Sequence, residues 1–245
     1  MLFRSGFAVT NSGGLVKTTN GGQTWSFGGT ISPYVLNSIF FLDNNLGWVS
    51  GADQVIKTTD GGENWLSLSL LPTMVDLNDV YFTSPLVGFV AADYGSLFKT
   101  IDGGATWSSV STGTSDNLNQ IFFVDDQIGF IAMDEGYFLK TTNGGSTWSV
   151  NYTTVDEDFN CVWFEDQNVG YLAGSWGTVL KTTNGGTSWT PQTTNSTTTF
   201  FACSFINQNV GFLCSAGNGV FSTVNGGTTW TSIPIGEYDY LYGIY

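Results

Sequence analysis

One nine-residue phrase recurs six times along this chain and limits what the chain can fold into. The first copy spans residues 17–25 and reads Lys-Thr-Thr-Asn-Gly-Gly-Gln-Thr-Trp, and the later copies end at Trp65, Trp107, Trp148, Trp189 and Trp230. Successive tryptophans are 40, 42, 41, 41 and 41 residues apart. A period of about 40 residues with short apolar runs and glycine turns is typical of a β-propeller. Because one repeat cannot bury its own apolar face, all six must stack together.

The residues around each phrase predict four short strands. In the repeat that contains Trp65 these are residues 36–41, 47–50, 54–59 and 64–68, which are rich in β-branched and aromatic side chains and are separated by Gly and Asx turns. The Asp60-Gly61-Gly62 sequence favours a hairpin between the last two strands. No segment requires a helix. We therefore predict an all-β, six-bladed β-propeller with four antiparallel strands per blade.

The two ends of the chain supply complementary parts of one repeat. Residues 6–9 match the second strand of a repeat, and residues 241–245 match the first strand. We expect a single domain over residues 1–245, closed by pairing of the N- and C-terminal strands, because closure removes exposed sheet edges. The predicted blades are residues 238–245 with 1–28, 35–70, 76–111, 117–152, 158–193 and 199–235.

The charge balance limits the possible partners. The chain carries 20 acidic and 6 basic residues, a formal net charge of −14. Such a chain repels phosphate backbones and anionic lipid surfaces, so we expect neither nucleic-acid nor membrane-surface binding. It has no apolar run long enough for a membrane span, and residues 1–7 lack the pattern of a signal peptide. A composition poor in lysine and rich in Thr, Asn, Ser and aromatic residues favours an extracytoplasmic or secreted bacterial protein.

The cysteines carry little information about function. Cys161, Cys203 and Cys214 form an odd set without the spacing of metal ligands. A disulfide between Cys203 and Cys214 is one interpretation, since both fall on neighbouring strands of one repeat. The favoured interpretation is that all three are small, buried, apolar side chains.

The repeated phrase, Thr-x-Asn/Asp-Gly-Gly-x-Thr-Trp, resembles the Asp-box, also called the bacterial neuraminidase repeat. Its fuller form, with Lys-Thr before it and an Asn-x-Ile-x-Phe strand ahead, resembles the photosystem II stability/assembly-factor-like propellers. The resemblance covers essentially the whole chain and implies a hairpin between the third and fourth strands, with an Asx side chain that accepts turn N–H groups and a Trp buried between blades. The predicted structural box residues are Asn20, Trp25, Asp60, Trp65, Asp102, Trp107, Asn143, Trp148, Asn184, Trp189, Asn225 and Trp230.

Two groups of Asp-box proteins imply different functions. Sialidases hold the substrate carboxylate with three arginines, whereas Arg4 is the only arginine here, so we exclude that activity. Photosystem assembly propellers are usually seven-bladed and carry a basic patch. This chain has six repeats, and its five lysines share one repeated position. The resemblance therefore implies only that this chain is a protein-binding or assembly scaffold.

We predict that one face of the propeller is acidic and aromatic. The loops between blades and those joining the second and third strands should lie on that face, and they contain 12 of the 20 carboxylates. Exposed aromatic rings and Asp or Asn groups suit a glycan, a peptide or a cationic protein patch. The alternative is that the acids keep the protein soluble and the Asn side chains satisfy strand ends. The candidate ligand-binding residues are Tyr94, Trp176, Asp93, Asp134, Glu135, Asp156, Glu157, Asp158, Asn37, Asn78, Asn119, Asn160 and Tyr242.

The residue types present give little support for catalysis. The chain has no histidine, so the usual triads and His-based metal sites are absent. We predict no catalytic residue, cofactor or metal, although a Ca²⁺ site at Asp156-Glu157-Asp158 remains an alternative. The predicted function is a non-enzymatic binding or assembly scaffold for a protein or glycan. The rival is a carbohydrate-active protein, either a lectin-like binder or a glycoside hydrolase with paired carboxylates. The ligand, the organism, the oligomeric state and any longer parent chain stay open.

Overall fold

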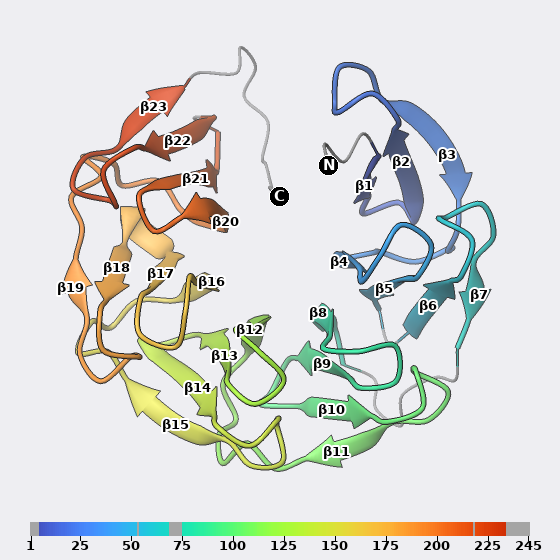
Figure 1. Cartoon of the computed structure of the whole chain (residues 1–245), viewed down its shortest axis with the longest axis horizontal. Helices are drawn as coiled ribbons and strands as arrows, with labels where there is room; N and C mark the ends of the chain where they lie inside the picture. The colour runs from blue at the N-terminus through green and yellow to red at the C-terminus, as the bar shows by residue number, and fades with distance from the viewer. Residues whose placement is uncertain (1–4, 53, 69–74, 218, 234–245) are drawn as a thin grey trace. The chain divides into compact units, whose positions relative to one another are not determined.

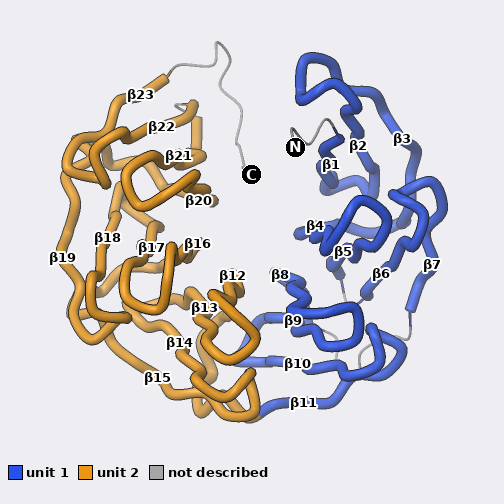
Figure 2. Tube along the Cα trace, in the orientation of Figure 1, with its two compact units in different colours: residues 1–110 blue, residues 111–245 orange. Residues whose placement is uncertain are grey.

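The computed structural model describes residues 5–52, 54–68, 75–217 and 219–233. The described residues form 23 β-strands and one short 3-10 turn, η1 (Ser175–Gly177). The chain groups into two compact units, Met1–Val110 and Ser111–Tyr245 (Figure 2). Each unit contains three antiparallel sheets.

The first unit holds the sheets of the first three repeats (Figure 1). In each sheet, the strands pair in chain order through tight turns. The first sheet has three strands, β1 (Gly6–Val9), β2 (Gly14–Thr18) and β3 (Ser26–Thr30). The second comprises β4 (Ser38–Phe41), β5 (Gly47–Gly51), β6 (Gln54–Thr58) and β7 (Leu66–Ser67), and the third comprises β8 (Leu77–Phe82), β9 (Gly88–Ala92), β10 (Leu97–Thr100) and β11 (Ser108–Val110).

The second unit repeats the same pattern in three four-stranded sheets. The first comprises β12 (Leu118–Phe123), β13 (Gly129–Met133), β14 (Tyr137–Thr141) and β15 (Ser149–Tyr152). The next comprises β16 (Phe159–Phe164), β17 (Gly170–Gly174), β18 (Val179–Thr182) and β19 (Thr190–Pro191). The last comprises β20 (Phe200–Asn207), β21 (Val210–Ser215), β22 (Val220–Thr223) and β23 (Thr231–Ile233).

These six sheets confirm the predicted fold class, an all-β, six-bladed β-propeller. The strands lie within the predicted blade intervals except β3, which continues to Thr30. The predicted strand 241–245, and with it the pairing of the chain ends, lies outside the described residues, and the single-domain prediction stays a prediction. No helix in the described part of the chain is long and apolar enough to cross a membrane.

Burial changes systematically from the first to the fourth strand of a sheet. The second strands are covered on both faces, so β9 and β13 are buried at every residue and are continuous apolar runs in the sequence. The fourth strands are largely exposed, as in β11 and β15. The sequence therefore alternates between strands that pack the core and strands that meet solvent.

Aromatic stacking joins neighbouring sheets within each unit. A second-strand ring of one blade lies flat against a first-strand ring of the next, as for Trp48 and Phe82, whose centroids are 3.5 Å apart. The box tryptophan of that next blade meets the same phenyl ring edge-on, as for Trp107 on Phe82 at 6.1 Å. The equivalent stacked pairs are Phe7–Phe41, Phe130–Phe164 and Tyr171–Phe205. The box tryptophan thus packs on an inter-blade core, with Trp230 buried and Trp65, Trp107, Trp148 and Trp189 partly buried. The prediction of burial is wrong for Trp25, which is 49% exposed.

Candidate binding face

The Asp-box is a self-contained hydrogen-bonded hairpin. Asp102 Oδ1 accepts hydrogen bonds from the Thr100 hydroxyl at 2.7 Å and the Thr106 N–H at 2.9 Å, and Oδ2 accepts one from the Thr106 hydroxyl at 2.6 Å. These bonds, with the Thr106 side chain contributing most, lower the pKa of Asp102 to about 2. In the box of Asn143, the side-chain amide instead donates to the Thr147 hydroxyl at 2.9 Å. The Asx groups are used inside the turn, which supports their predicted structural role.

The repeated lysines bind the next blade, which the sequence analysis missed. Lys57 Nζ donates to the carbonyl of Gly103 at 3.0 Å and lies 5.2 Å from the centroid of the Trp48 ring. The same contact joins Lys17 to Gly61, Lys140 to Gly185 and Lys181 to Gly226, at 3.3, 2.7 and 2.9 Å. These lysines therefore form inter-blade contacts and do not make a free basic surface. The signal in the sequence was their fixed position before five of the six boxes.

The aligned asparagines of the first strands also join blades. Asn37, Asn119 and Asn160 donate from Nδ2 to the carbonyls of Leu77, Phe159 and Phe200, each about one repeat further along, at 3.0, 2.9 and 2.8 Å. Asn78 donates to the Asp93 carboxylate at 2.9 Å. Their amides are engaged within the fold, which favours the structural alternative for these four predicted ligand-binding residues.

Asp134 is held by two amides in the second unit. Asn119 donates to its Oδ1 at 2.7 Å and Asn117 to its Oδ2 at 3.0 Å. Burial raises the pKa of Asp134 and the Asn119 hydrogen bond lowers it, while the nearby Asp158 carboxylate raises it further. Since both oxygens already accept hydrogen bonds, this geometry suits a fixed acceptor better than a proton donor to a substrate.

The turns between the second and third strands present the predicted aromatic residues to solvent. Tyr94 and Trp176 are 73% and 71% exposed. Both adopt left-handed backbone conformations, with φ of 57° and 54°, as does Glu135 at the same position of the intervening repeat. The next residue in each turn is a glycine with positive φ. In each turn the residue after the glycine donates its N–H to the carbonyl three residues earlier, as Ser96 does to Asp93 at 3.2 Å, so each is a β-turn with positive φ at both central positions.

The loop before β16 ties two of these turns together within the second unit. The Asp158 carboxylate accepts a hydrogen bond from the Glu135 N–H at 3.0 Å, and its backbone carbonyl accepts one from the Ser175 N–H at 2.9 Å. Asp158 therefore links the turn of Glu135 to that of Trp176. Asp156 is exposed and Glu157 is partly exposed. Among the described residues, no group of three or more acidic, Cys or His side chains is arranged to hold a metal ion, and the Ca²⁺ alternative is untested.

The remaining predicted residues are Tyr242 and the three cysteines. Tyr242 lies outside the described residues. Cys161, Cys203 and Cys214 are buried and free, so the alternative of a Cys203–Cys214 disulfide is wrong. Burial raises the pKa of Cys214 to about 12, which keeps the thiol protonated.

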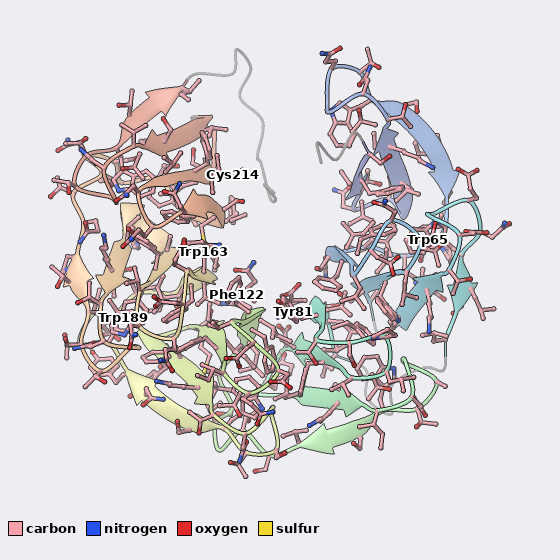
Figure 3. The ribbon with its side chains drawn as sticks, viewed as in Figure 1. Trp65, Tyr81, Phe122, Trp163, Trp189 and Cys214 are labelled. Carbon is pink, nitrogen blue, oxygen red and sulfur yellow. The ribbon has the colours of Figure 1, made fainter. Side chains whose placement is uncertain are left out.

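A row of first-strand aromatic residues was also missed. In the first unit Phe40 and Tyr81 have ring centroids 4.8 Å apart. In the second unit the centroids of Phe122 and Trp163 are 6.4 Å apart; Tyr81, Phe122 and Trp163 are labelled in Figure 3. All four are partly exposed and stand three residues after an aligned asparagine. That spacing was visible in the sequence, but alternating aromatic residues in a strand are more often core.

Six sheets, each with an Asp-box hairpin between its last two strands, define an Asp-box β-propeller. The family model described as photosynthesis system II assembly factor YCF48 matches residues 69–151, 107–192 and 151–239. The chain belongs to this family, which confirms the resemblance found in the sequence. No curated protein matches the chain significantly.

Solved structures show the same fold at low sequence identity. A structure of YCF48 bound to a D1 peptide has a TM-score of 0.74 and 18% identity, covering 94% of this chain and 77% of that one. YCF48 from Cyanidioschyzon merolae has a TM-score of 0.73 and 17% identity, covering 95% and 81%. The GH74 enzyme of Niastella koreensis has a TM-score of 0.76 and 17% identity, covering 93% of this chain but only 43% of the enzyme. At these identities the likeness shows the fold alone.

Proposed function

We propose that this chain is a non-enzymatic binding or assembly scaffold that recognises a protein partner through exposed aromatic turns, that of Tyr94 in the first unit and that of Trp176 in the second, each a contact by itself. The observation that carries the proposal is the conformation of these two exposed aromatic residues. A side chain with a Cβ in the left-handed region costs roughly 1–2 kcal/mol relative to glycine. The sixth repeat has Gly217 at the same position, with φ of 74°. The fold therefore does not need an aromatic residue there, and strain of this kind is typical of functional positions.

The surroundings of each turn favour apolar and basic side chains on the partner. Asp93 precedes Tyr94, and Asp158 is hydrogen-bonded to the turn that carries Trp176. The lysines of the second unit for which hydrogen bonds are seen, Lys140 and Lys181, donate to box carbonyls. An aromatic ring beside carboxylates attracts Lys or Arg side chains. That a family member has been solved with a D1 peptide supports a protein partner for this chain. An extracytoplasmic location is part of the proposal on composition alone.

The test uses peptides selected on the purified chain. A random peptide library displayed on phage is panned against it, and the affinities of recovered peptides are measured by fluorescence polarisation. We expect Tyr94→Asn/Trp176→Asn to weaken these peptides by about tenfold or more, as loss of aromatic anchors does. Asn is well tolerated at left-handed positions, so the variant should fold.

The repeats supply a matched control at two exposed apolar residues next to the Asp-box of Asp102, Leu86 and Ile101. Leu86 and Ile101 are 58% and 72% exposed, and other repeats carry Asn45 and Thr59 at those positions. Leu86→Asn/Ile101→Thr should therefore leave peptide affinity unchanged. The proposal fails if no peptide depends on Tyr94 and Trp176, or if the control variant is the one that loses binding.

A further inference from the structure

One pair of tyrosines departs from the repeat pattern in the second unit. Tyr137 and Tyr152 face each other across β14 and β15 as register partners. Their ring centroids are 4.9 Å apart with an interplanar angle of 42°, and Tyr152 is 48% exposed. The same two positions hold Ser96 and Ser111 in the preceding repeat, and Thr178 and Thr193 in the following one. The neighbouring blades therefore fold with small polar side chains at these positions, and the fold does not require the aromatic pair, in which Tyr152 is exposed and Tyr137 partly exposed.

The pair adjoins a loop cluster that is held in place. The Tyr152 ring lies over Gly136, since a Cβ added to that glycine would meet the ring at 2.9 Å. The Gly136 N–H donates to the Glu157 carbonyl at 2.8 Å, and the Thr153 hydroxyl donates to the Gly136 carbonyl at 2.9 Å. These bonds fix the turn of Glu135 beside the loop that carries Asp156 and Glu157. The tyrosines thus lie beside two hydrogen-bonded loops, the turn of Glu135 and the loop of Asp156 and Glu157, which both carry carboxylates.

A second departure falls in the same loop. Thr154 has φ of 74°, whereas the aligned residues of the neighbouring repeats are Gly113 and Asn195. Glycine and asparagine adopt this conformation readily, but a β-branched residue seldom does. This one repeat therefore differs from its neighbours at Tyr137, Tyr152 and Thr154, all at one end of one sheet.

We propose that the Tyr137–Tyr152 pair is a binding platform for a neutral saccharide. The C–H face of a sugar ring stacks on an exposed aromatic surface, and its hydroxyls donate to carboxylates and carbonyls. Residues 134–137 and 149–158 contain five acidic residues and no Lys or Arg, so uronic or sulfated sugars are repelled. Two tilted rings packed against each other do not surround a cation as an aromatic cage does. This site does not include Tyr94 or Trp176, the aromatic residues of the proposed protein-binding turns.

Affinity electrophoresis with soluble polysaccharides tests this platform. Native gels contain xyloglucan, mixed-linkage β-glucan or galactomannan, with polygalacturonate as the acidic comparison. At least one neutral polysaccharide should retard the protein, and polygalacturonate should not. Tyr137→Ser/Tyr152→Ser, which restores the serine pair of the preceding repeat, should lower the apparent affinity by about tenfold or more. Tyr137→Phe/Tyr152→Phe keeps the rings and should retain most of the retardation.

Two further measurements make the outcome decisive. Thermal unfolding of the serine variant should match that of the parent, because the neighbouring blades fold with serine or threonine at these positions. Tyr94→Asn/Trp176→Asn should leave retardation unchanged. The proposal is overturned if no neutral polysaccharide retards the chain, if the serine variant binds as the parent does, or if only the peptides selected on the chain lose affinity when the tyrosines are replaced.

Discussion

Lys57 donates a hydrogen bond from its ammonium group to the backbone carbonyl of Gly103, 46 residues further along the chain, at a distance of 3.0 Å. The donor stands before one Asp-box and the acceptor lies inside the next. Each repeat for which this bond is seen therefore anchors its neighbour's hairpin. Lysines make up most of the basic residues of this chain, and those that form this bond stabilise the fold.

Replacing Lys57 by methionine tests that contact. The methionine stem keeps apolar cover on Trp48 but removes the charged donor, so the Gly103 carbonyl keeps only the hydrogen bond from the Trp48 indole N–H at 3.2 Å. We expect Lys57→Met to lower the free energy of unfolding by about 1–2 kcal/mol, in the range for hydrogen bonds to charged groups. Urea denaturation measures it. An unchanged unfolding midpoint would show that the lysine is dispensable.

The box carboxylates predict a pH dependence. The folded pKa of Asp102 is about 2, below its ordinary value of 3.8. A depressed pKa stabilises the fold above the unfolded value, and this contribution disappears as pH falls through about 4 to about 2. Asp102→Asn should stay folded at neutral pH, because Asn143 fills the same position in the next repeat.

The measurement compares urea midpoints of the parent and Asp102→Asn at neutral and acidic pH. The parent should lose more stability than the variant between about pH 4 and pH 2. The converse change, Asn143→Asp, should add an acid-sensitive contribution. Parallel pH profiles in all three proteins would contradict the assigned role of the box carboxylate.

Trp107 tests the role of the box tryptophan, which is partly buried and packs on the core. Its ring meets Phe82 edge-on, and Phe82 in turn stacks on Trp48. Trp107→Ala should lower the free energy of unfolding by roughly 3–5 kcal/mol, as for other large aromatic residues removed from a core. Peptide affinity should be unchanged in the fraction that stays folded. A stable variant that loses binding would instead make the box functional.

Two buried serines give opposite predictions. Ser50 Oγ is buried and has no hydrogen-bond partner, and the aligned residues of the next repeats are Ala91, Ala132 and Ala173. Ser50→Ala should therefore be neutral or stabilise by up to about 1 kcal/mol. Ser215 Oγ is also buried but donates to the Gly219 carbonyl at 2.9 Å. Ser215→Ala should destabilise by about 1 kcal/mol, and calorimetry distinguishes the two.

The repeat made the fold predictable, and the same repeat concealed several roles. Trp107 and Asp102 belong to a short motif whose contacts are mostly local. The packing of Trp107 and the turn hydrogen bonds of Asp102 can therefore be predicted from sequence. The partner of Lys57 is a backbone carbonyl in the next repeat, and nothing in the local sequence marks it. Asn119 and Asn160 were predicted to bind a ligand because their side chains are polar. In the structure each donates a hydrogen bond to a backbone carbonyl of the next repeat. The tyrosine pair was missed because only strand pairing brings Tyr137 opposite Tyr152.

The central claim is that Tyr94 and Trp176 are held in strained turns for binding and not for stability. The most direct measurement is the free energy of unfolding of Tyr94→Asn/Trp176→Asn, because asparagine relieves left-handed strain. We predict that the variant is at least as stable as the parent, with a gain of up to about 1–2 kcal/mol, while its peptide affinity falls. A clear loss of stability in this variant would contradict the claim, because the two rings would then be part of the fold.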